Sequence, residues 1–454
     1  TWCLDEKKLV FTALLAELGR ADSKVVQRAV VAAASLPPVS PCIDRQVLAA
    51  LPPPPAVERR AQADAVRTTQ SRAFALLLAG KYPAGLELTH QALAQAEALG
   101  WPPMTAAVRE LEGNLLGKTA AYAKAEEANL AAYLEAAKVR TWDVAASAAS
   151  QLVFLIGDRQ ARFAEARVWA GHAEVAIGFA GDPLGLREAS RLHNLAIVQF
   201  RSGLYAQAKT LHEQALRIRE KALGPEHLDV AYSLGSLALV HKDLGAHAEA
   251  KALHERALRI REQALGPDHP DVAHSLNNLA KFHLDAGAYA EAKALVLRML
   301  GIQEKALGPE HPDVARTLNN LAEVHWRMRE YAEAKAIHQR VLSIREKALG
   351  PKHGDVAFTL NSLGELALEQ GRPAEALPFL ERAVAIFDAI PGVQEGESGS
   401  RFSLAEALMR SSGNRTRALV EARKAAADFR AAGASAAKDL AEVEAFLAKY
   451  PAAP

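Results

Sequence analysis

Four stretches of this sequence are near copies of one another: LGPEHLDVA (residues 223–231), LGPDHPDVA (265–273), LGPEHPDVA (307–315) and LGPKHGDVA (349–357). Each copy begins 42 residues after the previous one. A fixed period of this length is the sequence signature of a repeat protein, in which every repeat is one supersecondary unit that packs on its neighbours. The sequence therefore predicts an elongated repeat solenoid rather than a set of unrelated globular domains.

A second recurring position extends the array in both directions. Tyr289 and Tyr331 occupy equivalent places in two similar stretches, and the same position can be followed toward both ends in steps of 40, 41 and then 42 residues. A small residue comes three positions later each time, where two helices must approach closely. We therefore expect nine helix pairs, the first three and the last being degenerate. The recurring positions are Tyr82, Tyr122, Phe163, Tyr205, His247, Tyr289, Tyr331, Pro373 and Arg415, and the small residues are Gly85, Ala125, Ala166, Ala208, Ala250, Ala292, Ala334, Ala376 and Ala418.

Each repeat has the pattern of two amphipathic helices. Apolar residues between 276 and 282 follow helical spacing, and Gly287 ends this first helix because glycine tolerates the positive φ of a tight turn. The second helix, at about residues 290–307, ends at Gly308-Pro309. Pro312 then suits the first turn of the next helix. One pair cannot bury both of its apolar faces, so the pairs are expected to stack into one continuous core.

The two ends of the chain differ from the repeats. Residues 5–19 and 23–35 predict two short helices before a proline-rich linker, residues 392–400 predict a flexible loop, and residues 434–450 predict a final helix. The predicted fold class is all-α: a right-handed superhelical solenoid of about nine helix pairs with an N-terminal helical hairpin and a C-terminal capping helix. We expect four segments: the hairpin and linker in residues 1–55, degenerate repeats in 56–183, regular 42-residue repeats in 184–400, and the degenerate last repeat with the capping helix in 401–454.

Composition excludes several classes of function. The chain is 50% apolar and 24% charged, and its 54 basic and 53 acidic residues give a net charge of +1, whereas nucleic-acid binders usually carry a basic excess. It has no run of 18 apolar residues, and its two cysteines form no CxxC motif. Catalytic triads, nucleophile elbows and Walker loops are missing. We expect no enzymatic activity, no cofactor, no nucleic acid and no direct membrane insertion; the oligomeric state stays open.

Two series of histidines also recur with the repeat. Copies along a solenoid are too far apart to converge on one ion, so each copy is expected to fill the same structural place, and no metal site is predicted. The second series takes a position usually held by an aromatic residue, which favours packing between helices. The first series is His227, His269, His311 and His353; the second is His241, His283 and His325.

The repeat resembles that of a known family. It is longer than the 34 residues of an ordinary tetratricopeptide repeat. With its LGPxHPDVA junctions and the LNNLA stretches at residues 276–280 and 318–322, it closely resembles the repeats of kinesin light chains. The resemblance covers residues 184–400 strongly and residues 60–183 weakly. It implies a tetratricopeptide fold that binds a protein or an extended peptide; bacterial signalling proteins use the same unit widely.

The N-terminal residues carry a second resemblance. Cys3-Leu4-Asp5, Leu36-Pro37-Pro38, Cys42 and the proline-rich run are similar to the region after the membrane anchor of large bacterial serine/threonine protein kinases. The chain starts without Met and lacks the kinase signatures, so we expect the non-catalytic C-terminal part of such a kinase. This implies a location on the cytoplasmic or the extracytoplasmic side of a bacterial membrane. In the second case a disulfide between Cys3 and Cys42 is expected; reduced, partly buried thiols are the alternative.

The polar side of the first helices is the predicted binding surface, because in tetratricopeptide domains these helices line a concave groove. An asparagine amide both donates and accepts, so a ladder of asparagines, opened by Asn194, can pair with a peptide backbone. The alternative is that the second asparagine of each pair bridges adjacent repeats. Trp326 offers a rigid apolar anchor, unless it folds back on a neighbouring helix. The predicted groove residues are His274, Asn277, Asn278, Lys281, Arg316, Asn319, Asn320, Trp326, Arg327 and Asn361.

Two hypotheses of function follow. The first is a non-catalytic tetratricopeptide scaffold that holds a protein or an extended peptide segment in its groove. The mixed charges beside Trp326 suit a segment that combines an apolar side chain with acidic residues. The alternative is a ligand-sensing regulatory region of a bacterial serine/threonine kinase, which would control a catalytic domain upstream. Specificity depends on scattered groove residues, so the partner itself is not predicted.

Overall fold

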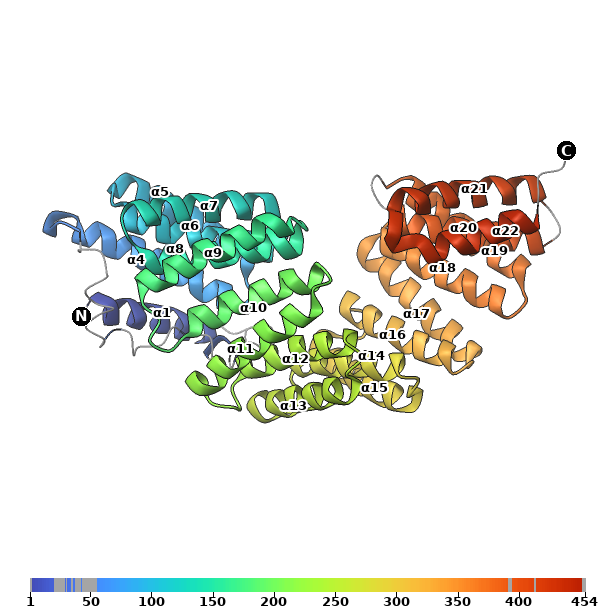
Figure 1. Ribbon diagram of the computed structural model, residues 1–454, viewed down its shortest axis with the longest axis horizontal. Coiled ribbons are helices and arrows are strands. Elements are labelled where there is room, and N and C mark those ends of the chain that lie inside the picture. The colour runs from blue at the N-terminus through green and yellow to red at the C-terminus, as the bar shows by residue number, and fades with distance from the viewer. Residues whose placement is uncertain are drawn as a thin grey trace. The chain divides into compact units, whose positions relative to one another are not determined.

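The computed structural model describes residues 2–19, 29, 31–33, 36, 42, 55–390, 394–411 and 414–450. All regular secondary structure in these residues is helical. The chain forms two compact units, Thr1–Ser275 and Leu276–Pro454, which are described separately below (Figure 1). The predicted all-α fold class is confirmed.

From Arg60 to Ala432 the described helices come in nine pairs. We call the first helix of each pair the inner helix and the second the outer helix. The inner helices are α4 (Arg60–Leu78), α6 (Pro102–Lys118), α8 (Trp142–Phe154), α10 (Leu186–Arg201), α12 (Leu228–Asp243), α14 (Pro270–Asp285), α16 (Pro312–Arg327), α18 (Gly354–Glu369) and α20 (Gln394–Arg410). The outer helices are α5 (Tyr82–Leu99), α7 (Tyr122–Lys138), α9 (Phe163–Ala180), α11 (Tyr205–Leu223), α13 (His247–Leu265), α15 (Tyr289–Leu307), α17 (Tyr331–Leu349), α19 (Pro373–Asp388) and α21 (Arg415–Ala432).

The recurring positions found in the sequence mark the starts of the outer helices. All nine, from Tyr82 to Arg415, are the first residue of an outer helix. The small residue three positions later is buried every time, and the eight alanines from Ala125 to Ala418 have no exposed surface. A larger side chain there would separate the two helices of the pair, since interiors are close-packed. The prediction of nine helix pairs is therefore confirmed.

The four near-identical stretches form one kind of junction between repeats. Gly224 follows α11 with a φ of +87°, a conformation that residues with a Cβ rarely adopt. His227 then caps α12, because its Nδ1 accepts a hydrogen bond from the backbone N–H of Asp229 at 3.1 Å. The same histidine-to-backbone bond recurs in the other three stretches, at His269, His311 and His353.

The turn inside each pair also repeats, but with less regular residues. Gly287 has a φ of +75°, as the sequence predicts. Ala120, Ala161 and Arg329 occupy the same place in other repeats and take φ values of +61°, +56° and +60°. A left-handed conformation costs an L-residue roughly 1–2 kcal/mol. The packing of the two helices therefore fixes this turn even where glycine is missing.

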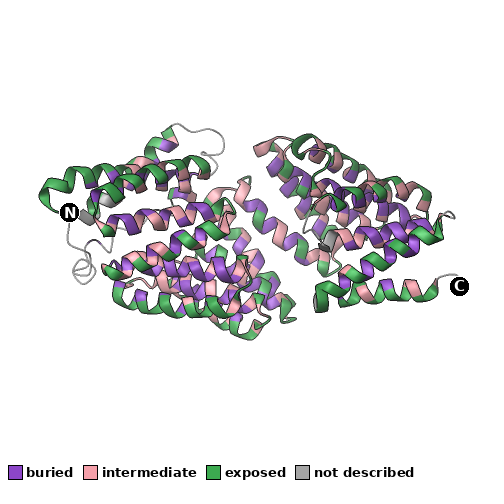
Figure 2. Ribbon diagram, turned by 90° about the horizontal axis from the view of Figure 1, so that it is seen from above, coloured by how far each residue is buried: buried purple, intermediate pink, exposed green. Residues whose placement is uncertain are grey.

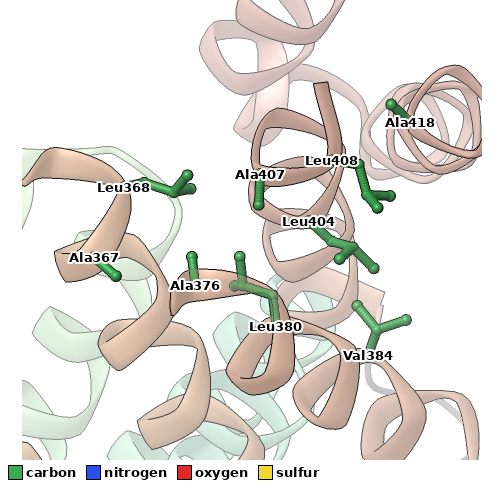
Figure 3. Close-up of a cluster of buried hydrophobic side chains, with 9 residues drawn as sticks. All are labelled: Ala367, Leu368, Ala376, Leu380, Val384, Leu404, Ala407, Leu408 and Ala418. Carbon is green, nitrogen blue, oxygen red and sulfur yellow. The ribbon is translucent and has the colours of Figure 1, made fainter. Parts of the chain in front are cut away.

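The core follows the helix pairs. Every helix carries buried and exposed residues on different sides (Figure 2), as expected for amphipathic helices. In the second unit, one cluster joins residues of α18, α19, α20 and α21, with Leu380 and Leu404 among its most buried members (Figure 3). Gly364 of α18 is needed beside it, since a Cβ there would lie 2.4 Å from Cγ of Leu380.

Outside the nine pairs, α1 (Trp2–Gly19) contacts α4, and α22 (Ala437–Lys449) packs on α21 as the predicted capping helix. The second helix predicted for the hairpin and the proline-rich linker fall almost wholly outside the described residues. The prediction of a loop at residues 392–400 is wrong from Gln394 onward, where α20 begins. Arg401 donates a hydrogen bond to Glu397 within this helix and another to Glu421 of α21.

The disulfide prediction is only partly within the described residues. Cys42 is buried, and none of the cysteines among those residues is free. The side chain of Cys3 lies outside them, so the pairing of Cys3 with Cys42 stays a prediction.

Candidate functional site: the inner helices

The inner helices of the first unit enclose a cavity of about 560 Å³. In this unit α4 contacts α6, α6 contacts α8, and α8 contacts α10, so these helices form one continuous surface. Residues of all four helices line the cavity, together with Lys7 and Val10 of α1. Cavities of this size are typical of ligand sites.

Glu110 of α6 is the most unusual group in this cavity. Its carboxylate oxygen Oε1 accepts hydrogen bonds from Ser147 Oγ at 2.6 Å and from Asn114 Nδ2 at 2.7 Å. Burial raises the pKa of Glu110, these two bonds oppose the shift, and the carboxylate of Asp143 raises the pKa further. The amide oxygen of Asn114 is buried without a hydrogen-bond partner. The cavity thus presents two carboxyl groups and an unused acceptor.

Basic groups also line the cavity, but two of them are already engaged. Arg67 is 4% exposed, and its guanidinium lies 3.7 Å from Asp64. Arg187 donates a hydrogen bond to the backbone oxygen of Gly181 at 3.0 Å. Lys7 lies beyond ion-pair distance of both Glu110 and Asp143, since neither forms an ion pair with a described residue.

The sequence did not predict this cavity. The predicted groove residues lie between positions 274 and 361, because only the regular repeats carry motifs that recur. A signal was nevertheless available. Glu110 and Asn114 are 12 and 8 residues before Tyr122, and Asn361 and Glu365 are 12 and 8 residues before Pro373. Aligning the repeats on the start of the outer helix would have placed all four on the inner side.

In the second unit, two of the predicted asparagines bridge neighbouring repeats. Asn320 Nδ2 of α16 donates to Asn277 Oδ1 of α14 at 2.8 Å. The bond joins the first asparagine of one repeat to the second asparagine of the next, so the bridging alternative applies to Asn320. A third, Asn361, donates to Glu365 Oε1 within α18 at 2.9 Å, and its own Oδ1 is buried without a partner.

The two predicted arginines of α16, Arg316 and Arg327, are exposed and paired within their own helix. Arg327 lies 2.7 Å from Glu323, and Arg316 lies 3.4 Å from Asp313. Both arginine side chains are at least 60% exposed, and exposed pairs of this kind contribute at most about 1 kcal/mol. Trp326 itself is half-buried. It therefore packs partly on its neighbours and presents only part of its ring to solvent.

The remaining predicted groove residues differ in exposure. Lys281 is exposed, whereas Asn278 and Asn319 are half-buried, and no hydrogen bond joins either of these two asparagines to another described residue. His274 is exposed but precedes the boundary between the two units, so the inner side of the second unit is considered from Asn277 onward. None of the described residues forms a group of three His, Cys, Asp or Glu that could hold a metal ion.

Polar pairs that the sequence analysis missed link four successive outer helices, α11, α13, α15 and α17, to the next inner helix. Arg219 of α11 donates to Ser233 Oγ at 2.5 Å, and Arg345 of α17 donates to Thr359 Oγ1 at 2.7 Å. Arg261 pairs with Ser275 in the same way, and in the repeat between, Gln303 replaces the arginine and pairs with Thr317.

Seven residues before each of these arginines lies a buried histidine: His212, His254 or His338. Burial, together with the neighbouring positive charges, lowers the pKa of each of the three to about 4. In the repeat that has Gln303, the histidine is replaced by Val296. The 42-residue spacing of this series was present in the sequence.

Comparison with known protein families identifies the regular repeats. The model of the tetratricopeptide repeat matches residues 188–263, 236–305, 271–345 and 313–389. Residues 188–389 are tetratricopeptide repeats. No curated protein matches this chain. Among the helices of the described ranges, none has both the length and the hydrophobicity that crossing a membrane requires.

Solved structures agree with the tetratricopeptide fold. The apo form of RapI has a TM-score of 0.55 and 16% identity, over 76% of this chain and 98% of that one. The apo form of the quorum sensor NprR from B. thuringiensis has a TM-score of 0.55 and 15% identity, over 80% and 99%. The tetratricopeptide-like repeats of a putative kinesin light chain from Podosopora anserina are 28% identical, over 46% and 99%, with a TM-score of 0.42. None of these matches concerns a kinase, so the link to a bacterial kinase stays a prediction.

Proposed function

We propose that this protein is a non-catalytic interaction scaffold whose second unit binds an extended segment of a partner protein along the inner side of α14, α16 and α18. The presence of tetratricopeptide repeats supports the proposal, because repeat solenoids use extended concave surfaces for binding. The proposed site runs from Asn277 to Glu365.

The observation that carries the proposal is the arrangement on α16. Trp326 is half-buried, and α16 also carries two exposed arginines: Arg327, the next residue, and Arg316, ten residues earlier. An aromatic side chain that is already partly held in place loses little conformational entropy on binding, and tryptophan and arginine are enriched among the residues that dominate interfaces. The ion pairs of the arginines are weak enough to be exchanged for carboxylates of a ligand. A segment with an apolar residue flanked by acidic residues fits this surface.

The asparagines have two different roles in this proposal. Asn319 supplies a free amide to the backbone of the bound segment. Asn320 acts indirectly, because its bond to Asn277 sets the spacing of α14 and α16. Only the first of these residues should contribute to affinity by direct contact.

The test is the affinity of the double variant W326A/N319A for a peptide that has a leucine between acidic residues. We expect affinity to fall by about 1–3 kcal/mol in total, since few residues dominate such an interface. Adding N320A should weaken binding further, by disturbing the spacing of the helices. Unchanged affinity in a folded double variant would contradict the proposal.

The control is Lys347→Ala. Lys347 lies on the outer helix α17, is 73% exposed and forms an ion pair with Glu310. It should leave peptide affinity unchanged. If K347A weakens binding as much as W326A/N319A, the peptide binds elsewhere.

A further inference from the structure

The cavity between the inner helices of the first unit contains carboxyl groups without a cationic partner. Among the residues that the structure describes, Glu110 receives hydrogen bonds only from neutral groups, the Ser147 hydroxyl and the Asn114 amide. No lysine, arginine or histidine of the described part of the chain forms an ion pair with Glu110 or with Asp143. Buried carboxylates are normally paired, because an isolated charge is costly to remove from water.

Two hydrogen-bond acceptors at this site are unused in the described part of the chain, one on Asn114 and one on Glu110 itself. The amide oxygen of Asn114 is buried and has no partner. The second carboxylate oxygen of Glu110, Oε2, has no hydrogen bond to any described residue. For the buried amide oxygen of Asn114, the missing donor costs about 1–3 kcal/mol. A ligand that brings several N–H donors and a positive charge would satisfy the carboxyl groups and the amide together.

The basic residues of the cavity argue less strongly for an anionic ligand. Three basic residues of the described ranges line the cavity, and two of them, Arg67 and Arg187, already have acceptors in Asp64 and the backbone of Gly181. Lys7 is a single further positive charge, against the two carboxyl groups of Glu110 and Asp143. An anion would have to break or share these interactions, and it would be repelled by Glu110 and Asp143 when they are ionised. A cation meets unused acceptors instead.

The size and the remaining lining of the cavity indicate what carries the cation. A volume of about 560 Å³ is larger than one side chain needs. Gln70 of α4 and Gln151 of α8 also line it, and neither side chain is hydrogen-bonded to another described residue. Such amides can both donate to and accept from a peptide backbone.

We infer that the first unit has a second binding site, a cavity that takes a peptide segment and holds its arginine or lysine side chain against Glu110, Asp143 and the amide oxygen of Asn114. The site lies wholly within the first unit and does not depend on the surface proposed above. The two sites select opposite charges, since the surface around Trp326 suits acidic segments.

The test uses two peptides that are acetylated and amidated, Gly-Arg-Gly-Arg-Gly and the same peptide with citrulline in place of arginine. Citrulline has nearly the same shape as arginine but no charge. Isothermal titration calorimetry with the full chain should show binding of the arginine peptide and at least tenfold weaker binding of the citrulline peptide. The lysine analogue should also bind. Equal binding of the arginine and citrulline peptides, or no binding of either, would overturn the inference.

Substitutions then locate the site. Glu110→Gln should weaken the arginine peptide at least tenfold, and Asp143→Asn should weaken it about threefold. The matched control is Glu112→Gln on the same helix, whose carboxylate lies 3.3 Å from His90 and does not line the cavity; it should have no effect. If circular dichroism shows that E110Q does not fold, the affinity of D143N for the arginine peptide tests the inference instead. Unchanged affinity in the folded cavity variants would overturn the inference, while W326A/N319A should leave this binding intact.

Discussion

The repeat formed by α6 and α7 in the first unit and the repeat formed by α18 and α19 in the second share a design but differ in two ways. On the inner side, α6 has glutamate then asparagine, at Glu110 and Asn114, and α18 has asparagine then glutamate, at Asn361 and Glu365. Both pairs form the same hydrogen bond between amide and carboxylate. Reversing the pair moves the carboxyl group by one helical turn while keeping the local bond.

The move changes what surrounds the carboxyl group. Glu110 faces the cavity. Glu365 accepts a hydrogen bond from Ser403 of α20 at 3.1 Å, and burial, with Glu323 and Glu369 nearby, raises its pKa. Glu110 likewise accepts a hydrogen bond from Ser147 of the next inner helix, so both carboxyl groups contact the following repeat. The difference that we propose is that Glu110 also binds a ligand.

The packing of the two helices of each pair shows the second difference. Gly113 and Gly364 lie nine residues before the outer helix, and the residue seven positions into the outer helix faces them: Asn129 in one repeat and Leu380 in the other. In the four repeats from α10 to α17, alanine replaces the glycine, and the facing position has His212, His254, Val296 or His338. The comparison teaches that one position in the repeat is filled by very different side chains, provided that its inner neighbour is small enough.

The largest effect is expected from pH, through the histidines at this position. Folding lowers the pKa of His212, His254 and His338 to about 4, below the ordinary value of 6.5. The unfolded chain therefore binds more protons between pH 6.5 and pH 4, so stability is complete above pH 6.5 and falls as the pH drops toward 4. Each histidine accounts for roughly 3 kcal/mol of this loss.

Chemical denaturation at several pH values measures this loss. The variant His338→Val copies Val296 and should make the stability of the second unit less dependent on pH. Replacing the exposed His90 with glutamine is the control and should not. A pH profile that H338V leaves unchanged would contradict the role of the buried histidine.

A smaller effect is expected from Gly364→Ala in the second repeat of the comparison. The new Cβ would lie 2.4 Å from Cγ of Leu380, which has no exposed surface, so the helices must separate. Overpacking of this kind costs about 2 kcal/mol. Thermal unfolding measures it, and Gly113→Ala should act similarly, since its Cβ would lie 2.1 Å from Asn129 Nδ2.

The chain offers both a rescue and a control for this variant. Adding Leu380→Val recreates the Ala280–Val296 pairing and should recover part of the stability. Gly235→Ala in α12 meets no atom within 4 Å and should stabilise by about 0.5–1 kcal/mol. A destabilisation by G235A equal to that of G364A would show that close packing is not the cause.

The smallest effect is expected at the turn inside the pair. Ala120 has a φ of +61° where the second repeat has Gly371 at +70°. Ala120→Gly should therefore stabilise the first unit by about 1 kcal/mol, and Gly371→Ala should destabilise the second by a similar amount. Differential scanning calorimetry compares the two, and shifts in the same direction would refute the explanation from backbone conformation.

Much of the fold could be predicted because it depends on residues that are close in sequence. Gly287 favours a left-handed turn because glycine tolerates a positive φ. An alanine such as Ala292 lets the two helices of a pair approach closely because its side chain is small. The candidate site was harder to predict. Asn277 and Asn320 are in identical motifs, yet their bond depends on how far one repeat is displaced from the next, which no single repeat encodes.

By itself, the sequence determined the all-α class, the nine helix pairs and the register of each pair, because a 42-residue period repeats the same local choices. Only the tertiary structure decided which polar residues stay available for a partner. Glu110 and Asn114 do not belong to a recurring sequence motif. They line a cavity because α4, α6, α8 and α10 bring side chains from four repeats together. The physical reason is the sequence distance between the residues that interact. A helix boundary depends on residues that are neighbours along the chain, whereas a binding site depends on side chains from distant parts of the chain that come together in the folded protein.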